Sequence, residues 1–206
     1  MAPRRRKGDK GMTATILTAL LFLSPVVTES GRFTIRQNGR LVGTEEFSVR
    51  AQNKGFLVEG KMKLEGDPET LNSRMELDES LNPISYEYTH GKGSIRIKVD
   101  SQSSELSVVE GGQPSTTNFR FPKGASIIDN NFFHHYLILL YRVKASEELF
   151  PIFVPQDMQV GIAKVRSTAA RTYALEVGEV NLVATVDEAG KLIRLEVPSA
   201  KVVVER

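Results

Sequence analysis

Apolar residues recur at every second position from Gly31 onward, and glycine-containing turn sequences interrupt the pattern at short intervals. In the segment RFTIRQ, Phe33 and Ile35 share one face of an extended chain, because successive side chains of a strand point to opposite sides. Asn38-Gly39 follows, and both residues tolerate the positive φ angles that a tight hairpin turn requires. This alternation predicts that the domain begins with an antiparallel meander.

The same pattern continues in SIRIKVD and in four further segments after residue 157. Short strands at regular spacing are typical of a sandwich or barrel and not of alternating parallel units. We therefore predict a mainly β domain with a strongly curved antiparallel sheet, a half-barrel or open barrel of about ten to twelve strands. No fixed-period repeat and no Gly/Ser-rich linker divides the chain, so residues 31–206 are expected to form a single domain.

One segment, DNNFFHHYLILLYR, departs from the alternation. Its apolar side chains surround nearly the whole circumference of a predicted helix near residues 129–144, and such a helix should be buried. We therefore expect the curved sheet to wrap around it. Asp129 is expected to be the N-cap, because a carboxylate there accepts hydrogen bonds from unpaired amides of the first turn.

Two adjacent histidines, His134 and His135, lie near the start of this helix. Adjacent residues are about 100° apart around a helix, whereas paired metal ligands prefer i, i+4 spacing. Only folding that adds Asp129 or His90 would complete a metal site, and we predict none. One histidine is expected to bond the backbone at the helix entrance, and the other to lie at the solvent boundary.

The first thirty residues differ from the rest of the chain. Arginines and lysines precede the uncharged run Met12–Leu23, and small polar residues follow it. This order predicts a signal peptide over residues 1–30, and hence export to the periplasm or the exterior. The run is shorter than the ~20 residues of a bilayer-spanning helix. An uncleaved membrane anchor and a disordered tail are the alternatives.

Composition excludes several classes of function. The chain contains no cysteine, which excludes disulfides, thiolate chemistry and cysteine-based metal sites. Five of the 27 Lys/Arg and two of the 25 Asp/Glu lie in residues 1–30, so the remainder carries 22 and 23, a balance of −1. No basic patch remains that would neutralise phosphates, and we predict no nucleic-acid partner.

Catalytic motifs are also missing from the sequence. It contains no G-x-S-x-G nucleophile elbow and no G-x-G-x-x-G phosphate loop, and no cofactor is predicted. The carboxylates of Glu76 and Asp78, and those of Glu45 and Glu46, are interpreted as solvated strand faces. The protein is therefore expected not to be an enzyme. A hydrolase that uses His134 or His135 with Asp129 or Glu76 is the alternative.

The aromatic residues allow two interpretations. If helix and sheet close tightly, these side chains form the core. If the sheet stays open on one side, its concave face can hold a lipid or another apolar ligand, because ligand sites are concave and mostly apolar. The candidate ligand-binding residues are Phe47, Phe56, Tyr86, Tyr88, Phe132, Tyr136 and His135.

Four segments together resemble bacterial exported families of unknown function: GRFTIRQNGRLVGTEEFSV, MELDESLNPISYEYT, DNNFFHHYLILLYR and VDEAGKLIRLEVP. The predicted layout is also similar to Lol-type envelope half-barrels, lipoprotein and lipid carriers in which helices plug a curved sheet. Those carriers have several plugging helices, whereas one is predicted here.

These observations favour an exported, non-catalytic envelope protein. The expected partner is an apolar, lipid-like small molecule or a membrane-associated envelope protein. The all-round apolar helix and the aromatic-rich strands support this interpretation. A structural scaffold of an envelope complex is a further alternative, beside the hydrolase.

Overall fold

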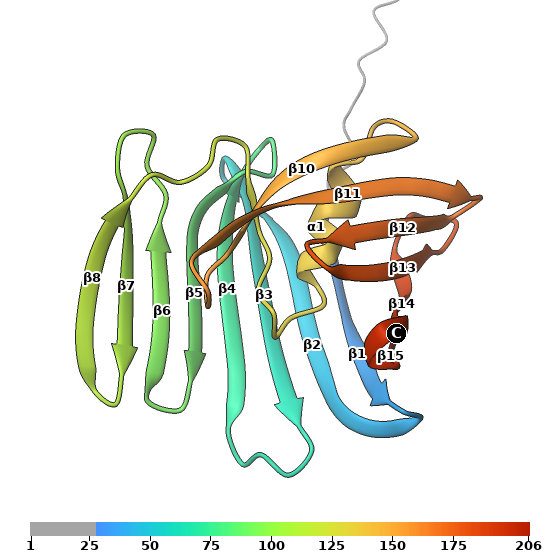
Figure 1. The fold of residues 1–206 in the computed structure, drawn as a ribbon, viewed down its shortest axis with the longest axis horizontal. Coiled ribbons are helices and arrows are strands. Elements are labelled where there is room, and N and C mark those ends of the chain that lie inside the picture. The colour runs from blue at the N-terminus through green and yellow to red at the C-terminus, as the bar shows by residue number, and fades with distance from the viewer. Residues whose placement is uncertain (1–27) are drawn as a thin grey trace, which may run out of the picture.

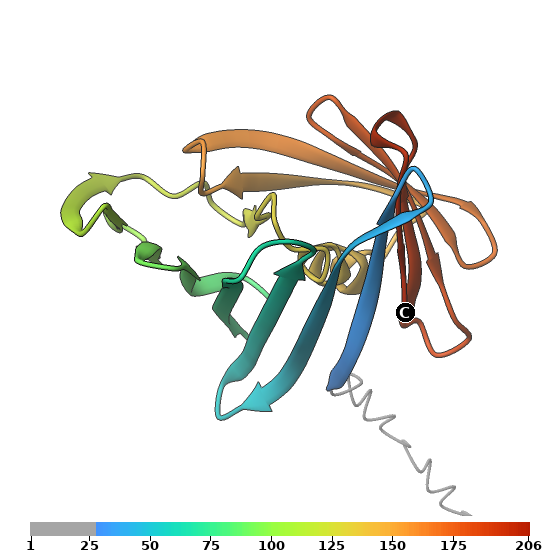
Figure 2. The same ribbon diagram turned by 90° about the horizontal axis from the view of Figure 1, so that it is seen from below.

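A computed structural model describes residues 28–206. Fifteen strands form one open sheet in the order β8-β7-β6-β5-β4-β3-β2-β1-β15-β14-β13-β12-β11-β10-β9 (Figure 1). All neighbours are antiparallel except β9 and β10. Figure 2 shows the sheet curling around α1, with β10 and β11 opposite β3–β5. The predicted curved antiparallel sheet around one helix is confirmed.

The strands of the first meander are β1 Glu29–Gln37, β2 Arg40–Gln52, β3 Gly55–Leu64, β4 Thr70–Asp78, β5 Pro83–His90, β6 Gly93–Lys98, β7 Ser104–Glu110 and β8 Gln113–Phe119. The chain then crosses through β9 Ser126–Ile127 and α1 His135–Arg142. The second meander comprises β10 Glu147–Val154, β11 Gln159–Ala169, β12 Thr172–Val177, β13 Val180–Val186, β14 Leu192–Val197, the short 3₁₀ helix η1 Pro198–Ala200 and β15 Val202–Glu205.

Tight turns connect successive strands as the sequence predicts. Asn38 and Gly39 have φ angles of 50° and 78°, so both occupy the left-handed region between β1 and β2. Gly111 and Gly112, at 56° and 80°, make the equivalent turn between β7 and β8. Two-residue turns of this hand match the twist of the flanking strands.

The predicted number of strands was too low, because three short segments gave weak signals. β9 has two residues and no visible alternation. β10 contains Pro151, which weakens the strand signal because proline lacks the N–H that a ladder needs. β9 pairs with β10 only at Ile152 and Phe153, so the proline lies outside that pairing. β15, with four residues, pairs with both β1 and β14.

The helix is shorter than predicted and begins later. It spans His135–Arg142 and not 129–144, and Asp129 is not its N-cap. Two apolar clusters pack on either side of it: Leu137 and Leu139 belong to the cluster under β1, β2 and β11–β15, whereas Ile138 belongs to the cluster under β3–β7. The expectation that sheet residues surround the helix is confirmed.

The predicted signal segment lies almost entirely outside the described residues. Glu29 and Ser30, its last two residues, are the first residues of β1. Glu29 is buried, and its carboxylate pairs with Arg206 and accepts a hydrogen bond from Tyr141. Among residues 28–206, no helix is long and apolar enough to cross a bilayer.

Candidate functional site

The residues predicted to bind a ligand lie in the core around the helix. Phe47, Tyr86, Phe132 and His135 are buried. Phe56, Tyr88 and Tyr136 are half-buried and pack against the two apolar clusters. The His135 ring lies 5.7 Å from that of Tyr86 and 5.8 Å from that of Phe132, measured between centroids. Folding brings Tyr86, Tyr88, Phe132 and His135 together, whereas the Phe47 ring stacks on Phe33.

Glu45 reaches from β2 to the start of α1. Its carboxylate accepts hydrogen bonds from the backbone N–H groups of Phe133 (2.8 Å) and His134 (3.0 Å), and from Nδ1 of His134. Phe133 and His134 directly precede α1, so Glu45, which is 0% exposed, holds the chain at the entrance to the helix. The first turn of α1 itself has no side-chain cap. The predicted solvated position of Glu45 is wrong.

His134 continues this contact toward the neighbouring strands. Its Nε2 lies 3.4 Å from the hydroxyl oxygen of Ser73 on β4. Its ring lies above Gly60 of β3, where a Cβ atom would come within 2.2 Å of the ring carbon Cε1. Gly60 is therefore the residue that lets the imidazole approach the sheet. His134 and His135 are both 0% exposed, so the prediction that one of them lies at the solvent boundary is wrong.

His135 and Asp129 form the second half of this polar group. The backbone N–H of Asp129 donates to Nδ1 of His135 (3.0 Å), which confirms that one histidine bonds the backbone. The proton of the neutral ring is therefore on Nε2, which has no hydrogen-bond partner within the described part of the chain. The Asp129 carboxylate accepts from the Tyr86 hydroxyl and from the N–H of Asn131.

We call these six residues the helix-entrance cluster: Glu45, Ser73, Tyr86, Asp129, His134 and His135. The two imidazoles meet edge to face, with centroids 4.5 Å apart. Burial lowers the pKa of His135 well below its usual value, and the nearby His134 lowers it further. Burial also raises the pKa of Tyr86 well above its usual value, with a smaller contribution from Asp129. Both groups are therefore neutral near pH 7.

Ser73, His134 and Glu45 are connected in the order of a nucleophile, a base and an acid. A working arrangement of this kind needs the nucleophile at a site that the substrate can reach. His134 and Glu45 are fully buried, and Ser73 is 4% exposed. Glu76, the other predicted acid, is not among the histidines' hydrogen-bond partners and pairs with Arg74 at 2.9 Å. The hydrogen bonds of the cluster connect the chain at the helix entrance to β2, β4 and β5.

No group of three or more metal-ligating side chains occurs in residues 28–206. His90, one of the residues considered for such a site, pairs instead with Asp67 (3.3 Å) and Glu69 (3.6 Å) at the end of β5.

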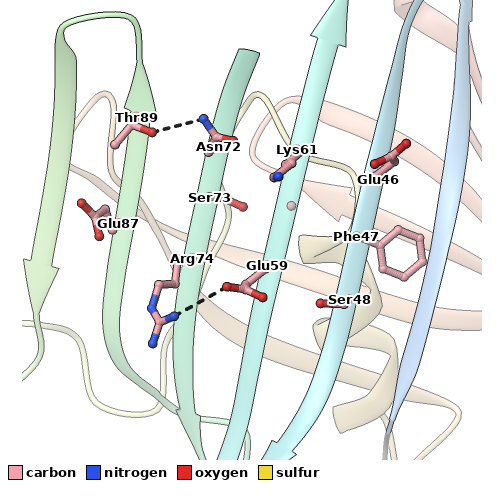
Figure 3. Close-up of a pocket in the computed structure, with 11 residues that line it drawn as sticks. Glu46, Phe47, Ser48, Glu59, Lys61, Asn72, Ser73, Arg74, Glu87 and Thr89 are labelled. Atoms are coloured by element: carbon pink, nitrogen blue, oxygen red, sulfur yellow. Dashed lines mark hydrogen bonds and ion pairs between the residues drawn. The ribbon is translucent and has the colours of Figure 1, made fainter.

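A polar depression of about 560 Å³ lies on the outer face of β2–β5, over Gly60 (Figure 3). Glu46, Glu59 and Glu87 extend into it beside two cations, and Arg74 pairs with Glu59 at 3.6 Å. Acidic and basic side chains offset one another here. The depression therefore has the character of a solvated strand face, as predicted for Glu46.

Strands β5–β8 extend away from the helix in Figure 1, and we call them the wing. A second cavity, of about 620 Å³, lies at one end of these strands. We call this space the wing cavity. Three segments line it: residues 82–83 at the start of β5, 99–101 after β6, and 120–125 between β8 and β9. Pro83, Val99, Phe121, Pro122 and Ala125 provide its apolar surface.

The wing cavity is continuous with the second apolar cluster. Val99 and Phe121 pack against that cluster from their half-buried positions. The Phe121 ring lies 6.3 Å from the Phe119 ring and 5.5 Å from the Phe153 ring, between centroids. An apolar group that enters the cavity therefore meets aromatic side chains.

The helix holds one wall of the wing cavity in place. The Arg142 guanidinium donates to the hydroxyl oxygen of Ser126 (2.5 Å) and to the carbonyl oxygen of Gly124 (2.9 Å). Burial lowers the pKa of Arg142 from its usual value. The N–H of Ala125 donates to the carbonyl of Pro122 (3.1 Å), which closes a tight turn with Gly124 at φ 71°.

Comparison with known proteins adds one weak neighbour. No protein-family model matches the chain, and no curated protein is detectably similar. A crystal structure of a DUF1089 family protein from Pseudomonas aeruginosa is 14% identical with a TM-score of 0.46, and the alignment covers 76% of this chain and 90% of that one. The neighbour belongs to a family of unknown function, and it provides no link to envelope carriers.

Sequence reasoning missed Glu45 and the wing cavity for different reasons. Glu45 lies two residues before Phe47 on the same strand, so the alternation itself places its side chain on the inner face. The interpretation as a charged surface pair overrode that signal. The wing cavity had no such signal, because its three segments are distant in sequence.

Proposed function

We propose that this protein is an exported, non-catalytic envelope protein that binds an apolar, lipid-like ligand in the wing cavity. The observation that carries the proposal is a cavity of about 620 Å³ whose apolar side chains continue into an aromatic cluster. Ligand sites typically have volumes of about 300–1,000 Å³ and mostly apolar linings with a few polar groups. Export is proposed from the sequence of residues 1–30.

The proposed site differs from the predicted residues but keeps the predicted chemistry. Phe47, Phe132 and His135 are buried against one another, so a ligand would have to displace the core to reach them. The wing cavity requires no such displacement. Asn82, Asp100 and Ser101 add polar groups to the lining, beside the apolar surface. This combination suits a molecule with one polar end.

A tryptophan at Val99 tests the proposal, because an indole there fills space in the cavity. The probe is N-phenyl-1-naphthylamine, an uncharged dye whose fluorescence rises in apolar sites. We expect the wild-type protein, purified without detergent, to enhance the dye, and Val99→Trp to abolish the enhancement. Val180→Trp is the matched control, since Val180 is an exposed valine at the start of β13.

Native mass spectrometry of the same samples identifies co-purified molecules. A lipid-sized mass on the wild type that is absent from Val99→Trp supports the proposal. Equal dye binding by the wild type and Val99→Trp contradicts the proposed site. If neither the wild type nor Val180→Trp binds the dye, the proposed function is contradicted.

The hydrolase remains the second candidate, because Ser73, His134 and Glu45 are connected by hydrogen bonds. A fluorophosphonate probe that labels Ser73 in the native protein would favour it. We expect no labelling, since Ser73, although it lines the polar depression, is only 4% exposed. An envelope scaffold is the third candidate, and the exposed apolar side chains Leu149, Val160 and Ile162 on β10 and β11 give it a contact surface to test by mutation.

A further inference from the structure

We infer that the wing cavity selects amphiphiles with an anionic head group, and that Arg120 and Lys123 bind that group. This inference rests on the proposed function and names its ligand class. The two cations flank Phe121 and Pro122 in sequence, and all four residues line the same cavity. The apolar surface and the positive charge are therefore provided by one segment of the chain.

Neither cation is used elsewhere in the described structure. Arg120 and Lys123 are exposed, and neither forms an ion pair with another residue of the 28–206 region. Most arginines on the neighbouring strands are paired, as Arg96 is with Glu87 at 2.7 Å and Arg74 with Glu76 at 2.9 Å. A free arginine and a free lysine at the mouth of an apolar cavity suit a carboxylate or phosphate.

The backbone fixes where these charges lie. Lys123 occupies the turn that the Ala125-to-Pro122 hydrogen bond closes, and Arg142 holds the next residue, Gly124, from the helix. The cation is therefore presented from a tight turn and not from a long loop. A fixed position reduces the ordering cost of binding a head group.

Asp100 is the acidic residue in the cavity lining, and it does not cancel both cations. Its Oδ1 accepts hydrogen bonds from the N–H groups of Gln102 (2.8 Å) and Ser103 (3.3 Å), within its own turn. The lining thus carries two positive charges and one negative charge, which leaves a net positive charge for the ligand.

The test compares two ligands with the same tail, dodecanoate and dodecan-1-ol, by calorimetry at low salt and below their aggregation concentrations. We expect the wild type to bind dodecanoate about tenfold more tightly, a difference in the range of two partly exposed charge contacts. The double variant Arg120→Gln/Lys123→Gln should bind both ligands with the affinity of the alcohol. Arg40→Gln/Lys92→Gln, which removes two exposed cations outside the cavity, should behave as the wild type.

Each outcome separates this inference from the function on which it rests. Equal binding of the two ligands by the wild type overturns the anionic preference but leaves apolar binding standing. A preference that survives in the double variant overturns the assignment to Arg120 and Lys123. If neither ligand binds the wild type, the proposed function itself fails.

Dodecyl phosphate distinguishes the two sources of such a head group. Tighter binding of dodecyl phosphate than of dodecanoate, lost in the double variant, assigns the site to phosphate-bearing lipids. The opposite order assigns it to free fatty acids. Either order of affinity supports a preference for anionic head groups. If dodecyl phosphate binds no more tightly than dodecan-1-ol, the preferred head groups are restricted to carboxylates.

Discussion

The helix-entrance cluster and the wing cavity both combine charged and aromatic side chains, but they differ in how completely these side chains are packed. In the helix-entrance cluster, all six residues form hydrogen bonds with another member, and Glu45 and His134 are both 0% exposed. In the wing cavity, Arg120 and Lys123 face solvent beside Phe121. Polar residues that bond each other stabilise the fold, whereas unpaired ones beside a cavity remain available to a ligand.

The segments with the most conspicuous sequence motifs are also not the segments that line the proposed binding site. Adjacent histidines beside acidic residues suggest chemistry, yet both imidazoles are 0% exposed. The segment RFPKG has no catalytic motif, yet it lines the larger of the two cavities described above. Accessibility, more than residue type, distinguishes the two regions.

Substitution of Glu45 is expected to have the largest effect. Glu45→Ala leaves two amides and an imidazole buried without their acceptor, and should reduce the free energy of unfolding by about 3–5 kcal/mol. Glu46→Ala, one residue later on the outer face, is the matched control and should change it little. Urea unfolding measures both. An equal decrease in the free energy of unfolding of the two variants would contradict the difference between the buried Glu45 and the solvated Glu46.

Gly60→Ala tests the close approach of His134 to the sheet. A methyl group there would lie 2.2 Å from the ring, so the imidazole must shift, at an expected cost of about 1–3 kcal/mol. Gly161→Ala on β11 is the control, because a methyl group there would have an ordinary contact with Ile152 at 3.4 Å. Thermal unfolding compares the two. A destabilisation at Gly161 as large as at Gly60 would contradict the special role of Gly60.

Acid should weaken the helix-entrance cluster. The pKa of His135 is lower in the folded than in the unfolded chain, so the unfolded state binds more protons below about pH 6.5. The contribution of neutral His135 to the free energy of unfolding is therefore fully present above that pH. It decreases as the pH falls, by at most about 1.4 kcal/mol per pH unit. Unfolding free energies at several pH values measure the slope.

His135→Asn provides the comparison for that slope, since its amide oxygen can still accept the Asp129 N–H. The variant should lose the part of the slope that His135 causes. An unchanged slope would assign the acid sensitivity to another group.

Arg142→Lys is expected to have the smallest effect, and it links the two regions. Lysine keeps the charge but cannot make both hydrogen bonds with the geometry of a guanidinium. Loss of one bond should weaken dye binding in the wing cavity about fivefold and increase hydrogen exchange near residue 124. Arg166→Lys on β11 should do neither. Faster exchange with unchanged binding would show that the wall held by Arg142 is not part of the site.

Much of the fold followed from local rules, because alternation and turn residues act over a few positions. Asn38-Gly39 defined its hairpin, and the all-round apolar pattern placed the helix inside the sheet. The start of the helix could not be found locally, since the chain just before it is held by Glu45, 89 positions before His134. Alternation also says which face a side chain occupies, but not where three distant segments leave space between them.

The seam between β1 and β15 has a consequence for how the molecule assembles. Every other antiparallel pair joins consecutive strands, whereas this seam pairs Thr34 with Glu205. Hairpins can therefore form in each meander as soon as it is synthesised, but the two halves can join only when the last strand has left the ribosome. Until then β1 exposes an unpaired edge, and such edges promote association between chains.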